Sequence, residues 1–581
     1  MHTLVTTISD LSFLVKGNTI DVLNGSFDKL ALSRLLQFLD TSYVWFYDEL
    51  PPDYLRGDIC ICEPDNSSSS DDYQFTIEFV MDPSYVWWFH REIECMALIQ
   101  QMGQLCTSAR NDQISIGVFV QPWGGNACPW YIITWAMLLM MKSDYRVVLI
   151  HNDLPFGPDY DFKRIEARSI ADVIALVNNY VPVVKYSEYL EDDVCSSGSY
   201  DFAYDLVKVN RIHYAKGERT HDASFLDGVF QASYRRECSS VEALLQYNRF
   251  DRLLVYSGVL WSPGLLSKVA HSMNILCATL ETANMHVYFS PEATSVHYDD
   301  IPLTVRAIRA EGESSVVYAI KVAQAEVDKR RTGSMQFNGL TQPPGQWEGM
   351  AGFALLLPNI VWDSMVIGLH TVFKDTLDWL EHTVRWLLDN TDLTIVVRRH
   401  PLERDPVYRG NDDFDALFAP FAESARFVYL PPESTVNTYS LMEQASFVCV
   451  ATGTTGLEAA ISGKPVLTCC DVYYAREGGV FHADTREAYE ELLSCAVGGD
   501  LTVTSPMREA ALLNYYASQC CVTKCDLFRP DRLDLPWKVK SADELVAHPG
   551  VQTVLESFIT RTPTSLLEHR ARIVRKASEM A

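Results

Sequence analysis

Apolar and polar positions alternate in a regular order over residues 352–498. GFALLLPNIV, at 352–361, is typical of a buried strand followed by a loop. Residues 374–390 then place their apolar side chains on one face of a helix. LTIVVRRHP, ARFVYLPPEST and FVCVATGTTG predict further strands, each followed by a loop. Strands that alternate with helices predict an α/β domain with a doubly wound parallel sheet.

The same alternation occupies residues 113–331, where strands at 114–120 and 145–150 flank an apolar helix. We therefore expect two Rossmann-like domains that face each other across a cleft. The Gly-, Pro- and Gln-rich residues 332–351 predict the linker between them. Residues 1–112 suggest no role, and we expect 499–581 to be a helical tail that packs back on the first domain.

The net charge and the spacing of the cysteines limit the kinds of ligand and partner that we expect. The net charge of -27 and the pI of about 4.9 argue against a nucleic-acid partner and against charge-driven binding to anionic lipid. The fifteen cysteines lack a disulfide framework, and Cys520, Cys521 and Cys525 have no matching second pair, so we expect neither disulfides nor a metal site.

No targeting or membrane-spanning segment is expected. The N-terminus lacks the pattern of a signal peptide. The most apolar run, residues 130–141, is shorter than the roughly 20 residues that cross a bilayer. We therefore expect a cytoplasmic protein whose membrane contact, if any, is peripheral.

The loop ATGTTGLE, at 451–458, is the sharpest local motif. Gly453 and Gly456 let a ligand approach the backbone closely, and the helix that follows offers free N–H groups to a phosphate. The hydroxyl groups of Thr454 and Thr455 add donors. Alternatively, Thr455 and Glu458 have the spacing of a capping box, which would only begin the helix. Both readings stay open at this point.

Three cationic residues stand at the end of the strand 393–397. Alternate strand residues point to opposite faces, so Arg398 and His400 share one side and Arg399 takes the other. We expect His400 and one arginine to contact an anionic ligand, with a histidine that carries charge near neutral pH. The alternative is an ion pair between an arginine and a carboxylate of the neighbouring helix, such as Asp375 or Asp378.

Four further polar residues are candidates for the cleft. Asp363 and Ser364 follow the first strand of the second domain, and they either contact the ligand or cap the next element. Asp153 and Glu281 are expected to end strands of the first domain. A carboxylate at a strand end is a candidate general base, although many such carboxylates are merely solvated.

The segments PNIVWDS, VVRRHPLE, STVNTYSLMEQASFVCVATGTTGLEAAISGKPVLT and YYAREGGVFHADTREAY resemble, in this order, the bacterial capsule polysaccharide biosynthesis family, which includes Kdo transferases. The resemblance is strongest over 352–490 and weaker over 113–290. Its His-Pro motif matches His400 and Pro401. Its serine/threonine-glycine-glutamate loop matches Thr454, Thr455, Gly456 and Glu458, with threonine where serine is common.

This resemblance implies a glycosyltransferase of the GT-B type, with the activated sugar held by the second domain and the acceptor by the first. The implied donor is a CMP-activated keto-sugar acid, which needs no metal or other cofactor. A GT-B-like nucleotide-sugar epimerase, a polyol-phosphate transferase and a non-catalytic scaffold subunit are the alternatives. Retention of both motifs favours an active enzyme.

Overall fold

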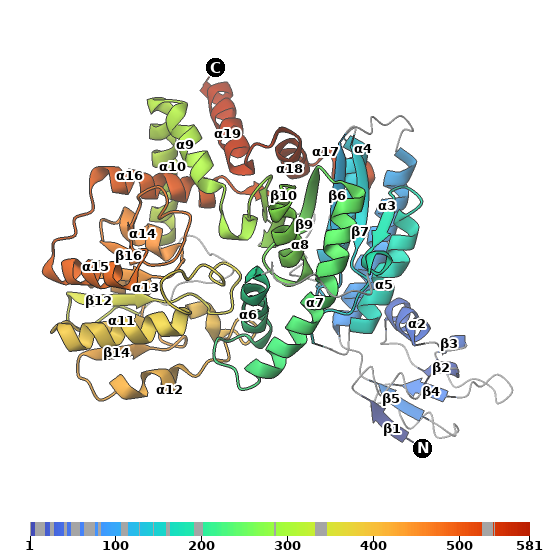
Figure 1. Cartoon of the computed structure of the whole chain (residues 1–581), viewed down its shortest axis with the longest axis horizontal. Coiled ribbons are helices and arrows are strands. Elements are labelled where there is room, and N and C mark those ends of the chain that lie inside the picture. The colour runs from blue at the N-terminus through green and yellow to red at the C-terminus, as the bar shows by residue number, and fades with distance from the viewer. Residues whose placement is uncertain are drawn as a thin grey trace. The chain divides into compact units, whose positions relative to one another are not determined.

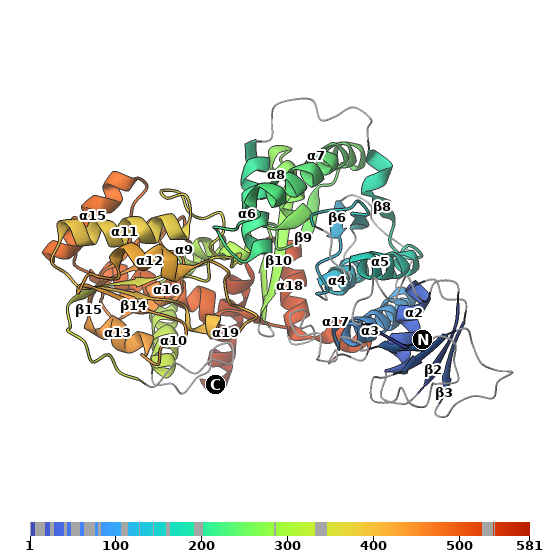
Figure 2. The same cartoon turned by 90° about the horizontal axis from the view of Figure 1, so that it is seen from below.

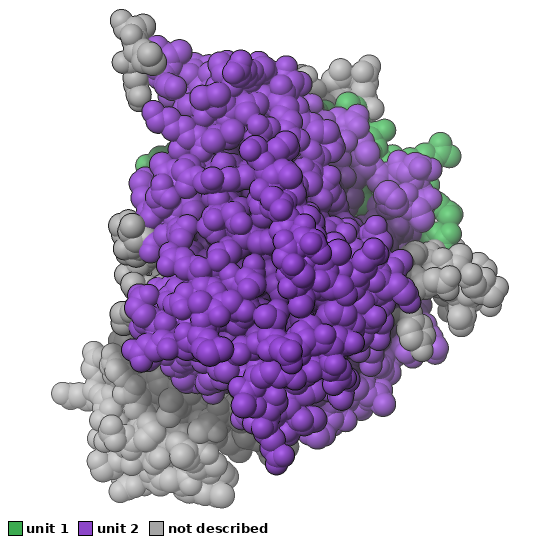
Figure 3. Space-filling model, turned by 90° about the vertical axis from the view of Figure 1, so that its left-hand side faces the viewer, with its two compact units in different colours: residues 1–191, 240–256, 525–552 green, residues 192–239, 257–524, 553–581 purple. Residues whose placement is uncertain are grey.

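The protein divides into two compact units, shown in different colours in Figure 3. One unit holds residues 1–191, 240–256 and 525–552, and the other holds 192–239, 257–524 and 553–581. The structure, a computed structural model, describes residues 114–126, 128–142, 145–158, 163–190, 201–283, 286–331, 345–525, 539 and 541–580, with residues 2–5, 15, 18–23, 28–39, 43–47, 59–62, 76–79 and 83–105. The polar loop at 63–73 and residues 332–344 of the predicted linker lie outside this set.

The N-terminal segment of the first unit forms a small parallel sheet (Figure 2). Its strands are β1 (His2–Val5), β2 (Thr19–Leu23), β3 (Tyr43–Tyr47), β4 (Ile59–Cys62) and β5 (Thr76–Phe79), in the order β1-β5-β4-β2-β3. Helix α2 (Lys29–Phe38) packs on α3 (Pro83–Leu105). Between these two helices, Arg34 forms an ion pair of 2.7 Å with Glu92, whose side chain is fully buried.

The second sheet of this unit confirms the α/β pattern that begins near residue 113. Its parallel strands follow the order β9-β6-β7-β8, and their bounds are β6 (Ser115–Val120), β7 (Arg146–His151), β8 (Val183–Lys185) and β9 (Arg252–Tyr256). Helix α4 (Cys128–Lys142) lies against β6, β7 and α3 and is buried along almost its whole length. The apolar run at 130–141 is therefore a core helix, as expected for a helix that is apolar all round. The unit's other elements are α5 (Lys163–Val177), η3 (Tyr186–Tyr189) and α17 (Ala542–Ala547).

In the second unit, β10 (Leu276–Ala283) pairs with β11 (His286–Ser290), and β11 pairs with β18 (Thr523–Lys524), both in antiparallel register. Helix α19 (Thr564–Met580) packs on α9 (Ile301–Ala310) and on β11. Thr564 Oγ1 donates to Phe289 O at 3.0 Å, and the buried His569 lies 3.0 Å from Ser315 Oγ. This part also contains α6 (Asp201–Ala215), α8 (Trp261–Ser272), η4 (Ser295–His297) and α10 (Glu313–Arg331), while α7 (Ala223–Asn248) and α18 (Pro549–Thr560) have residues in both units.

The larger sheet of the second unit has six parallel strands in the order β14-β13-β12-β15-β16-β17 (Figure 1). Counted along the chain from β12, this is the Rossmann order 3-2-1-4-5-6. The predicted α/β class with Rossmann-like domains is confirmed. The strands are β12 (Phe353–Leu357), β13 (Ile395–Arg398), β14 (Phe427–Leu430), β15 (Ala445–Val450), β16 (Val466–Thr468) and β17 (Phe481–His482).

Helices cover both faces of this sheet. On one face, Trp379 Nε1 of α11 (Thr376–Asn390) donates to Tyr489 Oη of α15 (Arg486–Gly498) at 2.9 Å. On the other face, α13 (Thr438–Gln444), α14 (Thr455–Ile461) and α16 (Ser505–Tyr515) share one apolar cluster with β12 and β15. The shorter elements are η5 (Pro401–Arg404), α12 (Phe414–Phe418), η6 (Ala419–Phe421) and η7 (Tyr516–Cys520).

A buried ion pair joins α10 to this domain, and we expect it to contribute to the stability of the folded protein. Arg330 Nη1 lies 3.1 Å from Glu458 Oε1, and both side chains are buried. Arg330→Ala leaves Glu458 buried without its cation, so we expect it to lower the free energy of unfolding by about 3–5 kcal/mol. Urea unfolding followed by tryptophan fluorescence measures the change.

Arg331→Ala is the matched control, because Arg331 stands in the same last turn and pairs with the exposed Glu443 at 2.8 Å. That pair is expected to contribute about 0–1 kcal/mol. Equal losses in the two variants would contradict the importance of the buried pair.

Candidate functional site

The strand order of the larger sheet defines where its loops separate. The chain leaves β12 toward β13 on one side, and it returns to β15 on the other side of β12. In open α/β sheets, ligands bind outside the carboxyl ends of the strands at such a reversal of strand order. The loops at this point are the residues after Leu357 of β12 and those after Val450 of β15.

The loop after β15 keeps backbone donors available. Tyr474 Oη donates to Gly453 O at 3.1 Å, and Gly456 N donates to the same oxygen at 3.0 Å. Among the described residues, none accepts a hydrogen bond from the backbone N–H of Gly453, Thr454 or Thr455. These three residues are half-buried. Two hydrogen bonds to Gly453 O thus position the loop, while the backbone N–H groups of Gly453, Thr454 and Thr455 have no acceptor among the described residues.

The two glycines of this loop differ in their surroundings. A Cβ on Gly456 would stand 2.9 Å from Val450 Cγ2 and 3.1 Å from Tyr474 Oη, closer than side chains normally approach. A Cβ on Gly453 would meet nothing nearer than Thr455 Oγ1 at 3.4 Å. Gly456 is therefore required by packing, whereas the surroundings of Gly453 have room for a side chain.

The capping box expected at Thr455 and Glu458 is absent. The N-cap of α14 is Thr454, and its side chain makes no capping hydrogen bond. Glu458 is instead buried against Arg330, and burial raises the pKa of Glu458 although Arg330 and Tyr439 act to lower it. The capping prediction was wrong because a cation from the distant helix α10 binds this carboxylate.

Arg398 ends β13 and is almost fully buried, with 1% of its surface exposed. Its Nη1 and Nη2 donate to Pro431 O at 2.5 Å and to Ser434 O at 3.2 Å. Burial, and next the charge of Arg404, lower the pKa of Arg398 to about 10. The guanidinium therefore fastens the loop after β14.

Arg399 forms an ion pair with Glu403, four residues along the chain, and lies over the ring of Phe414 at 4.1 Å. An ion pair at one arginine was the alternative reading of the sequence, but the partner differs from the two that were named. Asp375 caps α11 by accepting from Asp378 N at 2.9 Å, and Asp378 accepts from Lys374 N at 3.0 Å.

His400 lies half-buried between β13 and η5, in extended backbone with φ -64° and ψ 125°. That conformation agrees with the restriction that Pro401 places on the preceding residue. Leu402 N donates to His400 Nδ1 at 3.2 Å, which assigns the proton of the neutral ring to Nε2. Burial, and next the charge of Arg398, lower the pKa of His400 to about 4. At neutral pH the ring is therefore uncharged, so it can donate through Nε2 but does not act as a cation.

Asp363 and Ser364 belong to the loop after β12. Asp363 Oδ1 accepts from Met365 N at 2.9 Å, so its side chain caps a turn. Ser364 offers its carbonyl oxygen to His297 Nε2 at 3.0 Å. Asp363 therefore acts as a local cap, which was one of the two alternatives from the sequence, although it caps a turn and not a helix.

The two candidate bases have different surroundings. Asp153 is exposed and accepts from both Ser187 N, at 2.9 Å, and Ser187 Oγ, at 2.5 Å. Glu281 lies inside β10, opposite Tyr288 of β11, and not at the end of a strand as expected. The sequence suggested an end at Glu281 because this residue and Thr282 are polar, but the pairing with β11 continues through both to Ala283.

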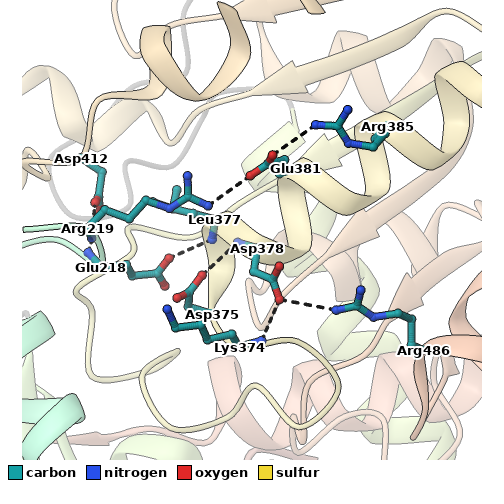
Figure 4. Close-up of polar contacts among 10 residues, drawn as sticks. All are labelled: Glu218, Arg219, Lys374, Asp375, Leu377, Asp378, Glu381, Arg385, Asp412 and Arg486. Carbon is teal, nitrogen blue, oxygen red and sulfur yellow. Dashed lines mark hydrogen bonds and ion pairs between the residues drawn. The ribbon is translucent and has the colours of Figure 1, made fainter. Parts of the chain in front are cut away.

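A carboxylate cluster at the N-terminus of α11 was missed by sequence reasoning (Figure 4). Glu218 accepts from Thr376 N at 2.9 Å and from Leu377 N at 2.8 Å. Asp412 in turn accepts from the backbone N–H of Glu218 and Arg219, at 2.9 and 2.8 Å. Burial, with Asp375 as the next influence, raises the pKa of Glu218 to about 7. The protein's own carboxylates thus occupy this helix N-terminus, and nothing in KGERT, residues 216–220, signals it.

Comparison with known proteins gives one family. Residues 345–489 match the family of capsule polysaccharide biosynthesis proteins. The resemblance noted from the sequence is confirmed over this segment, which holds the larger sheet and both motif loops. No curated protein sequence matches the chain.

Several solved structures are similar to the chain. The β-Kdo 2,7 transferase of Thermosulfurimonas dismutans KpsC has 19% identity and a TM-score of 0.27, covering 44% of this chain and 79% of that one. The β-Kdo 2,4 transferase of the same protein has 12% identity and a TM-score of 0.31, covering 45% and 79%. UDP-GlcNAc 2-epimerase of Methanocaldococcus jannaschii has 12% identity and a TM-score of 0.23, covering 68% and 97%. Because these TM-scores lie below 0.5, the activity proposed below rests on the family match and the site geometry.

Among the described residues, no group of three or more His, Cys, Asp or Glu side chains is arranged to hold a metal ion. Within the same part of the chain, every helix is too short or too polar to cross a bilayer.

The surroundings of Gly456 and Gly453 predict that alanine lowers the stability at the first position and leaves it almost unchanged at the second. Gly456→Ala is expected to lower the free energy of unfolding by about 1–2 kcal/mol, because overpacking exceeds the gain in helix propensity. Gly453→Ala is expected to change it by less than about 0.5 kcal/mol, since its Cβ makes only ordinary contacts. Thermal and urea unfolding measure both, and similar losses would contradict the packing difference.

The lowered pKa of His400 predicts how stability depends on pH. Between pH 6.5 and about pH 4 the unfolded chain binds a proton at His400 that the folded protein does not. The stability due to the neutral ring is full above pH 6.5 and is lost as the pH falls toward 4. Urea unfolding at several pH values should therefore show a steeper loss for the wild type than for His400→Gln. Parallel curves for the two proteins would contradict the lowered pKa.

Proposed function

We propose that this chain is a glycosyltransferase that moves a sugar from a nucleotide-activated donor to a glycan or glycolipid acceptor in surface polysaccharide synthesis. The observation that carries the proposal is the loop Gly453–Thr455, whose three unused N–H groups lie at the reversal of strand order within the family-matched segment. Backbone N–H groups without an acceptor in such a loop are suited to a phosphate oxygen.

His400 is proposed to act on the leaving phosphate. It follows β13, which is two strands away from β15, about 10 Å at the usual strand spacing. When the bond between sugar and phosphate breaks, negative charge grows on the phosphate. A fixed Nε2–H donor stabilises that charge more in the transition state than in the ground state. Because the ring is neutral, it does so by hydrogen bonding rather than by net charge.

The charges around this site favour a donor with a single phosphate. Arg398 is buried with both terminal nitrogens bound to carbonyl oxygens, and Arg399 is paired with Glu403, so we expect neither guanidinium to form an ion pair with a second phosphate. Neutral donors compensate one negative charge better than the two charges of a diphosphate. A CMP-activated keto-sugar acid, which the family resemblance implies, fits this requirement and needs no metal ion.

For the acceptor we keep both Glu281 and Asp153 as proposed bases; the two carboxylate oxygens of Asp153 accept from Ser187 N and Oγ. Glu281 is half-buried in β10 and accepts from Thr282 N at 3.3 Å. We also propose that the enzyme works in the cytoplasm, with peripheral membrane contact where its acceptor is lipid-linked.

A thermal-shift titration with CMP, UDP, GDP and dTDP tests the donor. A ligand that binds only the folded protein adds about 2.7 kcal/mol of stability at a hundredfold excess over its Kd. CMP is expected to raise the melting temperature most. His400→Ala is then expected to lower turnover roughly 10²–10³-fold, the effect of removing one such donor, while CMP affinity falls less. Full turnover in this variant, or no shift with any nucleotide, would overturn the proposal.

A further inference from the structure

Asn359 is a polar residue at the reversal of strand order that sequence reasoning did not select. It is the second residue after β12, the strand that separates β13 from β15. Its side chain crosses to the loop after β15, where Asn359 Oδ1 accepts from Thr452 N at 3.1 Å. One residue therefore connects the two loops that diverge at this point.

The hydrogen bond to Thr452 fixes which way the amide points. A backbone N–H only donates, so the carbonyl oxygen of the amide must face Thr452 and the NH₂ group must face away from it. In the described part of the chain, no group accepts a hydrogen bond from Asn359 Nδ2. The residue is half-buried, so a ligand can reach this donor.

The missing side chain of Gly453 keeps space next to this amide. A Cβ at Gly453 would stand 3.6 Å from Asn359 Oδ1 and 4.0 Å from Asn359 Nδ2. The amide thus lies next to Gly453, whose N–H, like those of Thr454 and Thr455, has no acceptor in the described part of the chain. Helix α14 has only seven residues, so the amide and the loop N–H groups, rather than a helix dipole, supply the donors.

We propose that Asn359 Nδ2 donates a hydrogen bond to an anionic phosphate oxygen of the donor nucleotide, bound against the Gly453–Thr455 loop. This inference rests on the proposed function and adds a ligand-contacting residue to it. Asn359 has two tasks in one side chain: its carbonyl oxygen positions the loop, and its NH₂ group contacts the ligand. An amide suits this place because a carboxylate would repel the phosphate and a hydrocarbon would release the loop.

Asn359→Asp separates the two tasks. The carboxylate still accepts from Thr452 N, so the loop stays in place, but the donor is lost and a negative charge faces the phosphate. CMP affinity, measured by isothermal titration calorimetry on the full chain, is expected to fall roughly a hundredfold. Asn359→Ala removes the donor and also the acceptor for Thr452 N without adding charge, and we expect a fall of roughly tenfold in CMP affinity. Cytidine, which has no phosphate, is expected to lose no more than about twofold in either variant, within the scatter of weak contacts.

Asn437→Asp is the matched control for the added charge. Asn437 Oδ1 caps α13 by accepting from Tyr439 N at 2.8 Å, which an aspartate also does. This variant is expected to bind CMP as the wild type does. Melting temperatures without ligand show that each variant is folded, and Asn359→Ala carries the test if Asn359→Asp does not fold.

The outcomes separate this inference from the proposed function. Wild-type CMP affinity in both Asn359 variants would overturn the inference alone. Equal losses for CMP and cytidine would also overturn it, because they would indicate a role in the shape of the loop rather than in phosphate contact. No binding of CMP by the wild type would overturn the proposed function and this inference together.

Discussion

Strand β12 has no polar side chain, and all five of its residues are buried between two layers of helices. A central parallel strand covered on both faces accepts only apolar residues. The polar side chains next to β12 therefore lie in the loop that follows it. The chain also leaves β12 on one side and returns on the other, so the loops after β12 and β15 diverge there. The place of the candidate site follows from these two constraints.

Most of the charged side chains discussed above bind other groups of the protein. Glu458 is bound to Arg330, Arg399 to Glu403, and Glu218 to the N-terminus of α11. The Nη1 and Nη2 groups of Arg398 donate hydrogen bonds to carbonyl oxygens. The remaining hydrogen-bond donors are neutral. Three backbone N–H groups and the Asn359 amide lie at the reversal of strand order, and the neutral imidazole of His400 follows β13. Such a set stays oriented without a ligand, and this preorganisation is what electrostatic catalysis requires.

The regular elements could be predicted because their patterns are local. The helical face of 374–390 is α11, and the strand at 114–120 is β6, within two residues at each end. The strand expected at 393–397 begins later and includes Arg398, because hydrogen bonds to β12 and β14 decide where a strand ends. The hairpin that places Glu281 inside a strand is local, since Glu281 pairs with Tyr288 of the next strand, β11.

The sequence by itself determined the α/β class, the periodicity of the elements and the two motif loops, because these depend on residues close together along the chain. Only the tertiary structure decided which polar residues are free. Arg330 and Glu458 are 128 positions apart, and Asn359 and Thr452 are 93 apart, so no local pattern pairs them. A buried charge must find a partner wherever the fold provides one, and an amide whose oxygen is bound on one side has its NH₂ group turned to the other. For this reason, Glu458 is bound within the protein, and Asn359 is the residue for which we propose a ligand contact.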